Sequence, residues 1–95
     1  MTPEQQQAIQ QYLAVVGEVQ AGADRNMVTA FQIARFLGEA TAEAAGPEAI
    51  ERNRQAIEPH ARKLEWLAEQ RMLSWVRLPD HLQEPGLFCY RLSSG

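Results

Sequence analysis

A change in the hydrophobic period near Gln70 is the feature that most limits what this chain can fold into. Before it, apolar residues over 61–68 recur every three or four positions, which places them on one face of a helix. After it, segments 72–78 and 87–92 are rich in strand-forming residues. Residues 79–86 lie between them and carry prolines and a closing glycine, which is turn chemistry. The pattern therefore predicts a helix followed by a β-hairpin over residues 72–92.

The start of the chain predicts a helix over residues 3–21. Thr2 can cap it, and Pro3 suits the first helical position. Apolar residues then recur at helical spacing from Ile9 to Val19. Their stripe is broader than a narrow seam, so part of it is available to a partner.

A second, shorter helix is predicted over residues 29–38. Thr29 is its expected cap, and Gly38 is its expected end. Positions 30–37 are mostly apolar, which is unusual for so short a helix. We therefore expect this helix to be well buried.

The segment from Glu39 to Pro59 allows more than one structure. Residues 39–46, rich in alanine and glutamate, either continue the second helix or form a loose connection. Pro47 can open an extra helix over about 47–57. A proline inside a helix costs roughly 3 kcal/mol, so Pro59 predicts a separate helix over about 58–70. The alternative is one long helix kinked at Pro59.

Length and composition favour one small domain spanning residues 1–95. No apolar run reaches the roughly 20 residues that cross a bilayer, and the start lacks the order of a secretory signal. A single cysteine, Cys89, excludes an intramolecular disulfide. We therefore expect a cytoplasmic protein with no membrane partner.

Catalysis and metal binding are not expected. His60, His81 and Cys89 match no zinc spacing. The sequence has no glycine-rich phosphate loop, nucleophile elbow or paired-carboxylate arrangement. We therefore predict a protein that is not an enzyme and has no metal or cofactor.

Two stretches resemble the winged helix-turn-helix superfamily of DNA-binding regulators. Residues 29–38 look like its second helix, in which a capping threonine precedes a short apolar helix ending in glycine. Residues 62–73 look like the end of its recognition helix entering the wing. The resemblance implies an α+β, mainly α fold with three to four helices and a C-terminal two-stranded hairpin wing. This chain departs from the pattern at Arg71, where the superfamily commonly has glycine, and in its long connection from Gly38 to Pro59.

The resemblance also implies a transcriptional regulator that binds double-stranded DNA as a homodimer. Net charge is −3, but the distribution is uneven: seven acidic and two basic residues precede Arg52, and five acidic and seven basic residues follow from there. In such domains the recognition helix enters the major groove and the wing contacts the backbone. The expected DNA-binding residues are Arg52, Arg54, Gln55, His60, Arg62, Lys63 and Arg77.

A rival interpretation is a protein-protein interaction module within a larger assembly. Trp66 projects opposite the apolar face of its helix, and tryptophan is enriched at interface hot spots. It either packs under the Glu39–Arg54 segment or meets a second subunit. The expected partner interface combines Trp66 with Tyr12, Val15 and Val19. A continuous positive stripe along the long helix would favour DNA, and an apolar patch around Trp66 would favour a protein partner.

Overall fold

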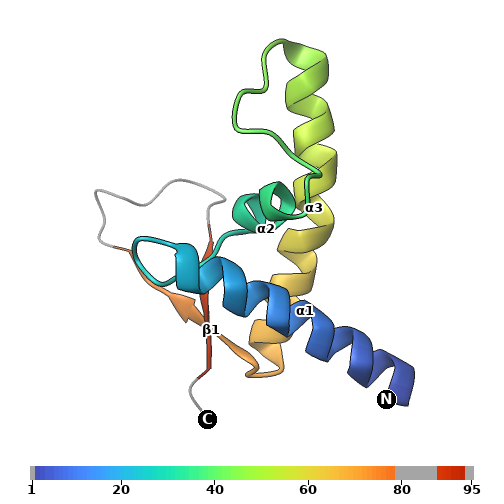
Figure 1. Ribbon diagram of the computed structural model, residues 1–95, viewed down its shortest axis with the longest axis vertical. Helices are drawn as coiled ribbons and strands as arrows, with labels where there is room; N and C mark the ends of the chain where they lie inside the picture. The colour runs from blue at the N-terminus through green and yellow to red at the C-terminus, as the bar shows by residue number, and fades with distance from the viewer. Residues whose placement is uncertain (1, 79–87, 94–95) are drawn as a thin grey trace.

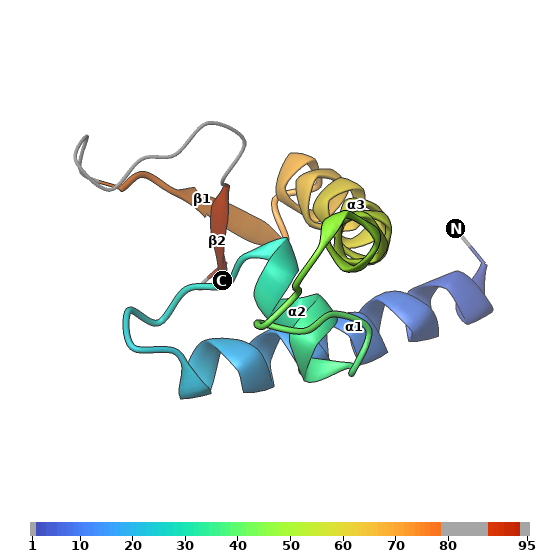
Figure 2. The same cartoon turned by 90° about the horizontal axis from the view of Figure 1, so that it is seen from above.

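The computed structural model describes residues 2–78 and 88–93, which form three helices and a two-stranded antiparallel sheet (Figure 1). In chain order the elements are α1 (Pro3–Gly22), α2 (Ala30–Phe36), α3 (Pro47–Glu69), β1 (Leu73–Val76) and β2 (Cys89–Leu92). This part of the chain is therefore α+β and mainly helical, as the sequence predicts. Viewed from above, the hairpin and α3 lie on the same side of α1 (Figure 2).

The first two helices begin as predicted, each with a reciprocal capping box. The Thr2 hydroxyl accepts from the Gln5 amide, and the Gln5 side chain accepts from the Thr2 amide. Thr29 and Gln32 repeat the arrangement at the start of α2. Both helices satisfy amides that a helix start would otherwise leave without partners.

The predicted break at Pro59 is wrong, because α3 is one continuous helix from Pro47 to Glu69 with Pro59 inside it. Proline removes the amide that would bond the carbonyl of Gln55, but Gln55 is exposed, so water can satisfy that carbonyl. The buried positions His60, Leu64 and Leu67 follow at helical spacing. These buried positions hold the part of α3 that follows Pro59.

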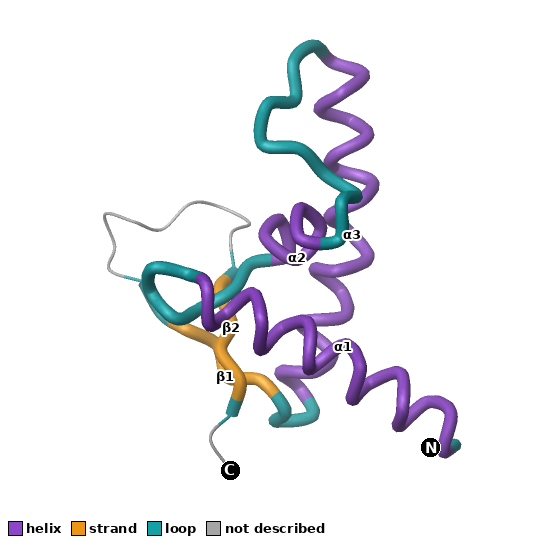
Figure 3. The backbone as a smooth tube through the Cα atoms, in the orientation of Figure 1, coloured by secondary structure: helices purple, strands orange, loops and turns teal. Residues whose placement is uncertain are grey.

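The segment 39–46 is a connection of turns and irregular backbone, not an extension of α2. Helix α2 ends at Phe36, and Gly38 follows with φ of +75°. The connection then runs beside the N-terminal half of α3, which stands away from the rest of the molecule (Figure 3). Thr41 and Asn53 join the two: the Asn53 side-chain amide donates to the Thr41 carbonyl at 2.6 Å, and its oxygen accepts from the Thr41 amide at 3.2 Å.

The two strands of the hairpin pair in the register Leu73↔Leu92 to Val76↔Cys89. On the other edge of β2, Val28 exchanges two backbone hydrogen bonds of 2.8 Å with Tyr90. One residue of the α1–α2 connection therefore extends the sheet. The expected turn over residues 79–86 lies outside the described residues.

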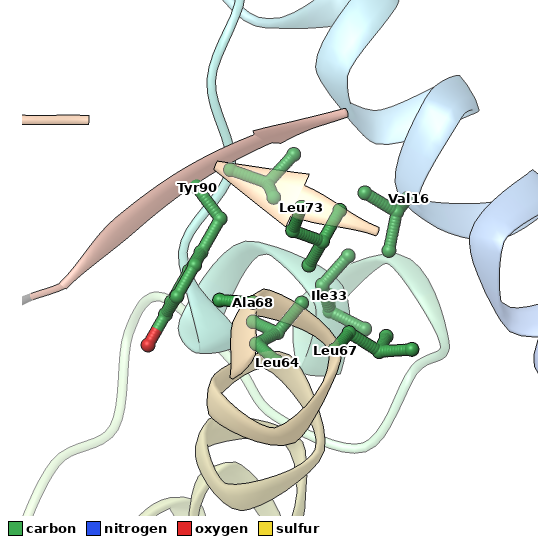
Figure 4. Close-up of a cluster of buried hydrophobic side chains, with 8 residues drawn as sticks. Val16, Ile33, Leu64, Leu67, Ala68, Leu73 and Tyr90 are labelled. Carbon is green, nitrogen blue, oxygen red and sulfur yellow. The ribbon is translucent and has the colours of Figure 1, made fainter. Parts of the chain in front are cut away.

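Side chains from every helix and strand converge on one core (Figure 4). Its buried members lie where α1, α2, α3 and the hairpin meet: Val16, Val28, Ile33, Leu64, Leu67, Ala68, Leu73 and Tyr90. This core holds the C-terminal half of α3 firmly against the hairpin. Trp75 and Phe88, two aromatic residues of the hairpin, do not join this core, because both are largely exposed.

The turn from α3 into β1 places a non-glycine residue in the left-handed region. Arg71 has φ of +64°. The amide of Met72 then donates to the Leu67 carbonyl at 2.9 Å, closing the end of the helix. A side chain in this conformation costs on the order of 1 kcal/mol, because its Cβ crowds the following carbonyl.

We therefore predict that Arg71→Gly is more stable to urea unfolding than Arg71→Ala by up to about 1 kcal/mol. Both variants lose the same charge, but only glycine removes the Cβ. Equal stability of the two variants, or a more stable alanine variant, would show that this turn holds no strain.

Candidate functional site

The exposed arginines of α3 are held by carboxylates on the same helix. Arg54 donates to both oxygens of Glu51, at 2.6 and 2.9 Å, and also lies 3.6 Å from Glu58. Arg62 donates to the other oxygen of Glu58 at 2.5 Å. We call Glu51, Arg54, Glu58 and Arg62 the charge ladder. The hydrogen bond from Arg54 lowers the pKa of Glu51, so the carboxylate stays charged.

The ladder replaces the positive stripe that would favour DNA. Its four members alternate in sign, and their charges cancel. Arg54 and Arg62 remain 63% and 77% exposed, so they are accessible, but a phosphate would have to compete with Glu51 and Glu58 for them. Gln55 also donates to Glu51, at 3.4 Å.

The remaining basic candidates do not join the ladder. Lys63 is turned about 100° from Arg62, because adjacent residues in an α-helix are that far apart. Its ammonium lies 4.5 Å from the centre of the Tyr12 ring, on the side of α1. Arg52 and Arg77 are exposed. The structure thus divides the predicted DNA-binding set among several faces.

His60 leaves that set, because it is only 7% exposed. Its Nδ1 lies 2.8 Å from the Tyr12 hydroxyl, and its Nε2 lies 2.5 Å from a Glu39 carboxylate oxygen. The Tyr12 and His60 rings also stack, with centroids 5.8 Å apart. We call Tyr12, His60 and Glu39 the polar clamp, since it joins α1, the connection after α2 and α3.

One arrangement of hydrogen atoms satisfies every polar group of the clamp. Burial, together with the negative charge of Glu39, raises the pKa of Tyr12 above its ordinary value. The phenol therefore stays protonated and can donate to Nδ1 of His60 in the tautomer that carries its hydrogen on Nε2. In that tautomer the Nε2–H of His60 donates to Glu39, and every polar group of the clamp has a partner.

An apolar groove of about 750 Å³ lies between α1 and the C-terminal half of α3. Trp66 on α3 is 40% exposed and faces this groove together with Tyr12 and Val15 of α1. Most of the lining is apolar or uncharged: Gln5, Ala8, Ile9, Gln11, Tyr12, Val15, Leu37, Lys63, Trp66 and Leu67. Lys63 is the one charged residue among them.

The structure therefore brings together three of the four predicted partner residues. Tyr12, Val15 and Trp66 line one groove, whereas Val19 lies further along α1, is partly buried against the core and does not line it. Of the two alternatives for Trp66, packing under the Glu39–Arg54 segment is not supported, because no residue of that segment lines the groove with it, and contact with a second subunit stays a prediction. Leu37 and Lys63 were not predicted to belong to this surface. The sequence predicts the helical positions of both residues, but it does not predict that α1 packs beside α3.

Metal-binding clusters and membrane-spanning helices are absent from the described part of the chain. No three histidine, cysteine or acidic residues gather there in a position to hold a metal ion. No described helix has the length and apolar character needed to cross a membrane. Comparisons with protein-family models, with curated proteins and with solved structures found no match to this chain.

We predict that Tyr12→Phe lowers the free energy of unfolding at neutral pH by about 1–3 kcal/mol, because His60 loses its Nδ1 partner in a buried position. Urea unfolding followed by circular dichroism measures the change. Glu39→Gln, which keeps a hydrogen-bond acceptor for Nε2, is the milder companion variant. An unchanged free energy for Tyr12→Phe would contradict the clamp.

The dependence of stability on alkaline pH gives a second test of the Tyr12–His60 hydrogen bond. Because the folded state raises the pKa of Tyr12, its contribution is complete below the unfolded value of about 10. It is lost as pH rises through the folded pKa. Wild-type stability should therefore fall more steeply above pH ~10 than that of Tyr12→Phe. Burial also raises the pKa of Tyr90, so the variant should retain part of the slope.

Proposed function

We propose that this domain is a protein-interaction module with a winged helix-turn-helix fold, and that it binds through the α1–α3 groove. The observation that carries the proposal is the exposed indole of Trp66 in an apolar groove of about 750 Å³. Tryptophan and tyrosine are enriched among the residues that dominate binding energy, and charged residues are depleted at interface centres. This groove has both properties.

The order of elements supports the finer fold assignment. A helix, a short apolar helix, a long helix and a hairpin follow one another, which is the order on which the resemblance to the superfamily rests. The fold assignment alone does not decide function, because one fold serves many functions. The groove and the charge ladder therefore carry the choice between partners.

Removal of the indole tests the groove directly. We expect helical peptides selected from a displayed library on the wild-type domain to bind Trp66→Ser about tenfold or more weakly, a loss of roughly 1.4 kcal/mol or more. Trp75→Ser is the matched control, because Trp75 is also exposed but lies on the hairpin. Fluorescence anisotropy of labelled peptides measures both. Equal losses in the two variants would overturn the proposal, as would failure to select any peptide at protein concentrations at which the domain is monomeric.

A second candidate is duplex DNA binding by a regulator of this fold. It is favoured by the N-terminal half of α3, which stands away from the body and exposes Arg52 and Arg54 (Figure 1). A helix end of this kind can enter a major groove. The charge ladder opposes it, because Arg54 is paired with Glu51 and Arg62 is paired with Glu58.

Glu58→Gln decides this second candidate. The substitution releases Arg62 from its only ion pair in the described residues and removes one negative charge. If α3 binds DNA, the variant should bind a duplex several-fold more tightly than wild type, with a steeper dependence on salt. Anisotropy of a labelled duplex at increasing salt measures it. Absence of binding by wild type and variant alike, even at low salt, would exclude this candidate.

A further inference from the structure

We infer that the occupant of the α1–α3 groove is α1 of a second copy of this chain, so that two copies pair through their first helices. The inference rests on the proposed interaction function and commits it to one partner. Three features of α1 carry it: the spacing of its groove residues, the sign of its charges and the exposure of its N-terminal end.

The groove residues of α1 have the spacing of a helix-pairing seam. Six residues of α1 line the groove, and four of them, Gln5, Ala8, Tyr12 and Val15, are separated by three, four and three residues, with Ile9 and Gln11 on either side of that stripe. That alternation keeps one stripe of a helix facing a partner helix. A different stripe of α1 enters the core through Val16, which is fully buried. Tyr12 and Val15 are only partly buried against that core, so part of their surface is left to the groove.

Charge complementarity identifies α1 itself as the matching occupant. Over its 20 residues α1 has two charged side chains, Glu4 and Glu18, and both are acidic. The groove has one charged lining residue, Lys63, which is basic. Among the described residues Lys63 forms no ion pair, and its ammonium lies over the Tyr12 ring. An almost uncharged helix with acidic residues therefore fits an almost uncharged groove with one cation.

The N-terminal end of α1 also lacks cover within one copy. Residues 2–8 are all exposed, and this end of the helix extends past α3 (Figures 1 and 2). Short helical segments without tertiary contacts are marginal in water. Pairing with a second copy places this end along the partner's groove, and by symmetry each copy covers the other.

Sedimentation equilibrium of the full chain tests the pairing. We expect a dimer of twice 10.7 kDa for wild type, and a dissociation constant raised about tenfold or more by Val15→Glu. Ala14→Glu adds the same charge at the adjacent exposed position, about 100° around the helix, and should leave the dimer intact. Lys63→Glu should weaken the dimer more than Lys63→Gln. Circular dichroism checks that each variant is folded.

Isotope-filtered NOE spectra of a mixture of labelled and unlabelled chains locate the interface. Contacts between the Trp66 indole and α1 of the other copy support the inference. A monomer at all concentrations overturns it, as does a dimer whose intermolecular contacts arise from the hairpin aromatics Trp75 and Phe88. In either case the peptide measurements on Trp66→Ser judge the proposed function separately, because groove binding by a foreign helix does not need a dimer.

Discussion

The arrangement of the three helices depends on the two hydrogen bonds of the buried His60 side chain. His60 lies on α3, but its two ring nitrogens reach Tyr12 on α1 and Glu39 after α2. These partners are 48 and 21 residues away along the chain. A buried imidazole with both nitrogens satisfied is directional in a way that apolar contacts are not. It sets the distance and the orientation of α1 relative to the middle of α3.

The groove follows from this way of joining the helices. Where α1 meets α2 and the hairpin, apolar side chains such as Val16 and Ile33 fill the space between them. Where α1 faces α3, a polar clamp and the Lys63–Tyr12 contact span the gap instead. The described residues leave the apolar lining of this side partly uncovered.

Local features of the fold could be predicted from the sequence, and long-range ones could not. The caps at Thr2 and Thr29 and the hairpin strands depend on residues within a few positions, so the pattern predicts them. The continuity of α3 through Pro59 is not a local property, because it depends on the Thr41–Asn53 hydrogen bonds before the proline and on the burial of His60 after it. The burial of His60 was missed for the same reason, since its partners are distant in sequence. The sequence shows that Trp66 lies opposite the apolar face of its helix, but only the packing of α1 beside α3 places the indole in a groove.

The contact of Lys63 with Tyr12 has a chemical consequence of its own. Lys63 is the single lysine of the chain, whereas the other eight basic residues are arginines. Any reagent or enzyme that modifies side-chain amines must therefore act at the α1–α3 groove and nowhere else on the side chains. Acetylation there would erase the groove's one positive charge while leaving its apolar walls in place. Lys63 is therefore a single site for amine modification, and it lies on the surface that we propose for partner binding.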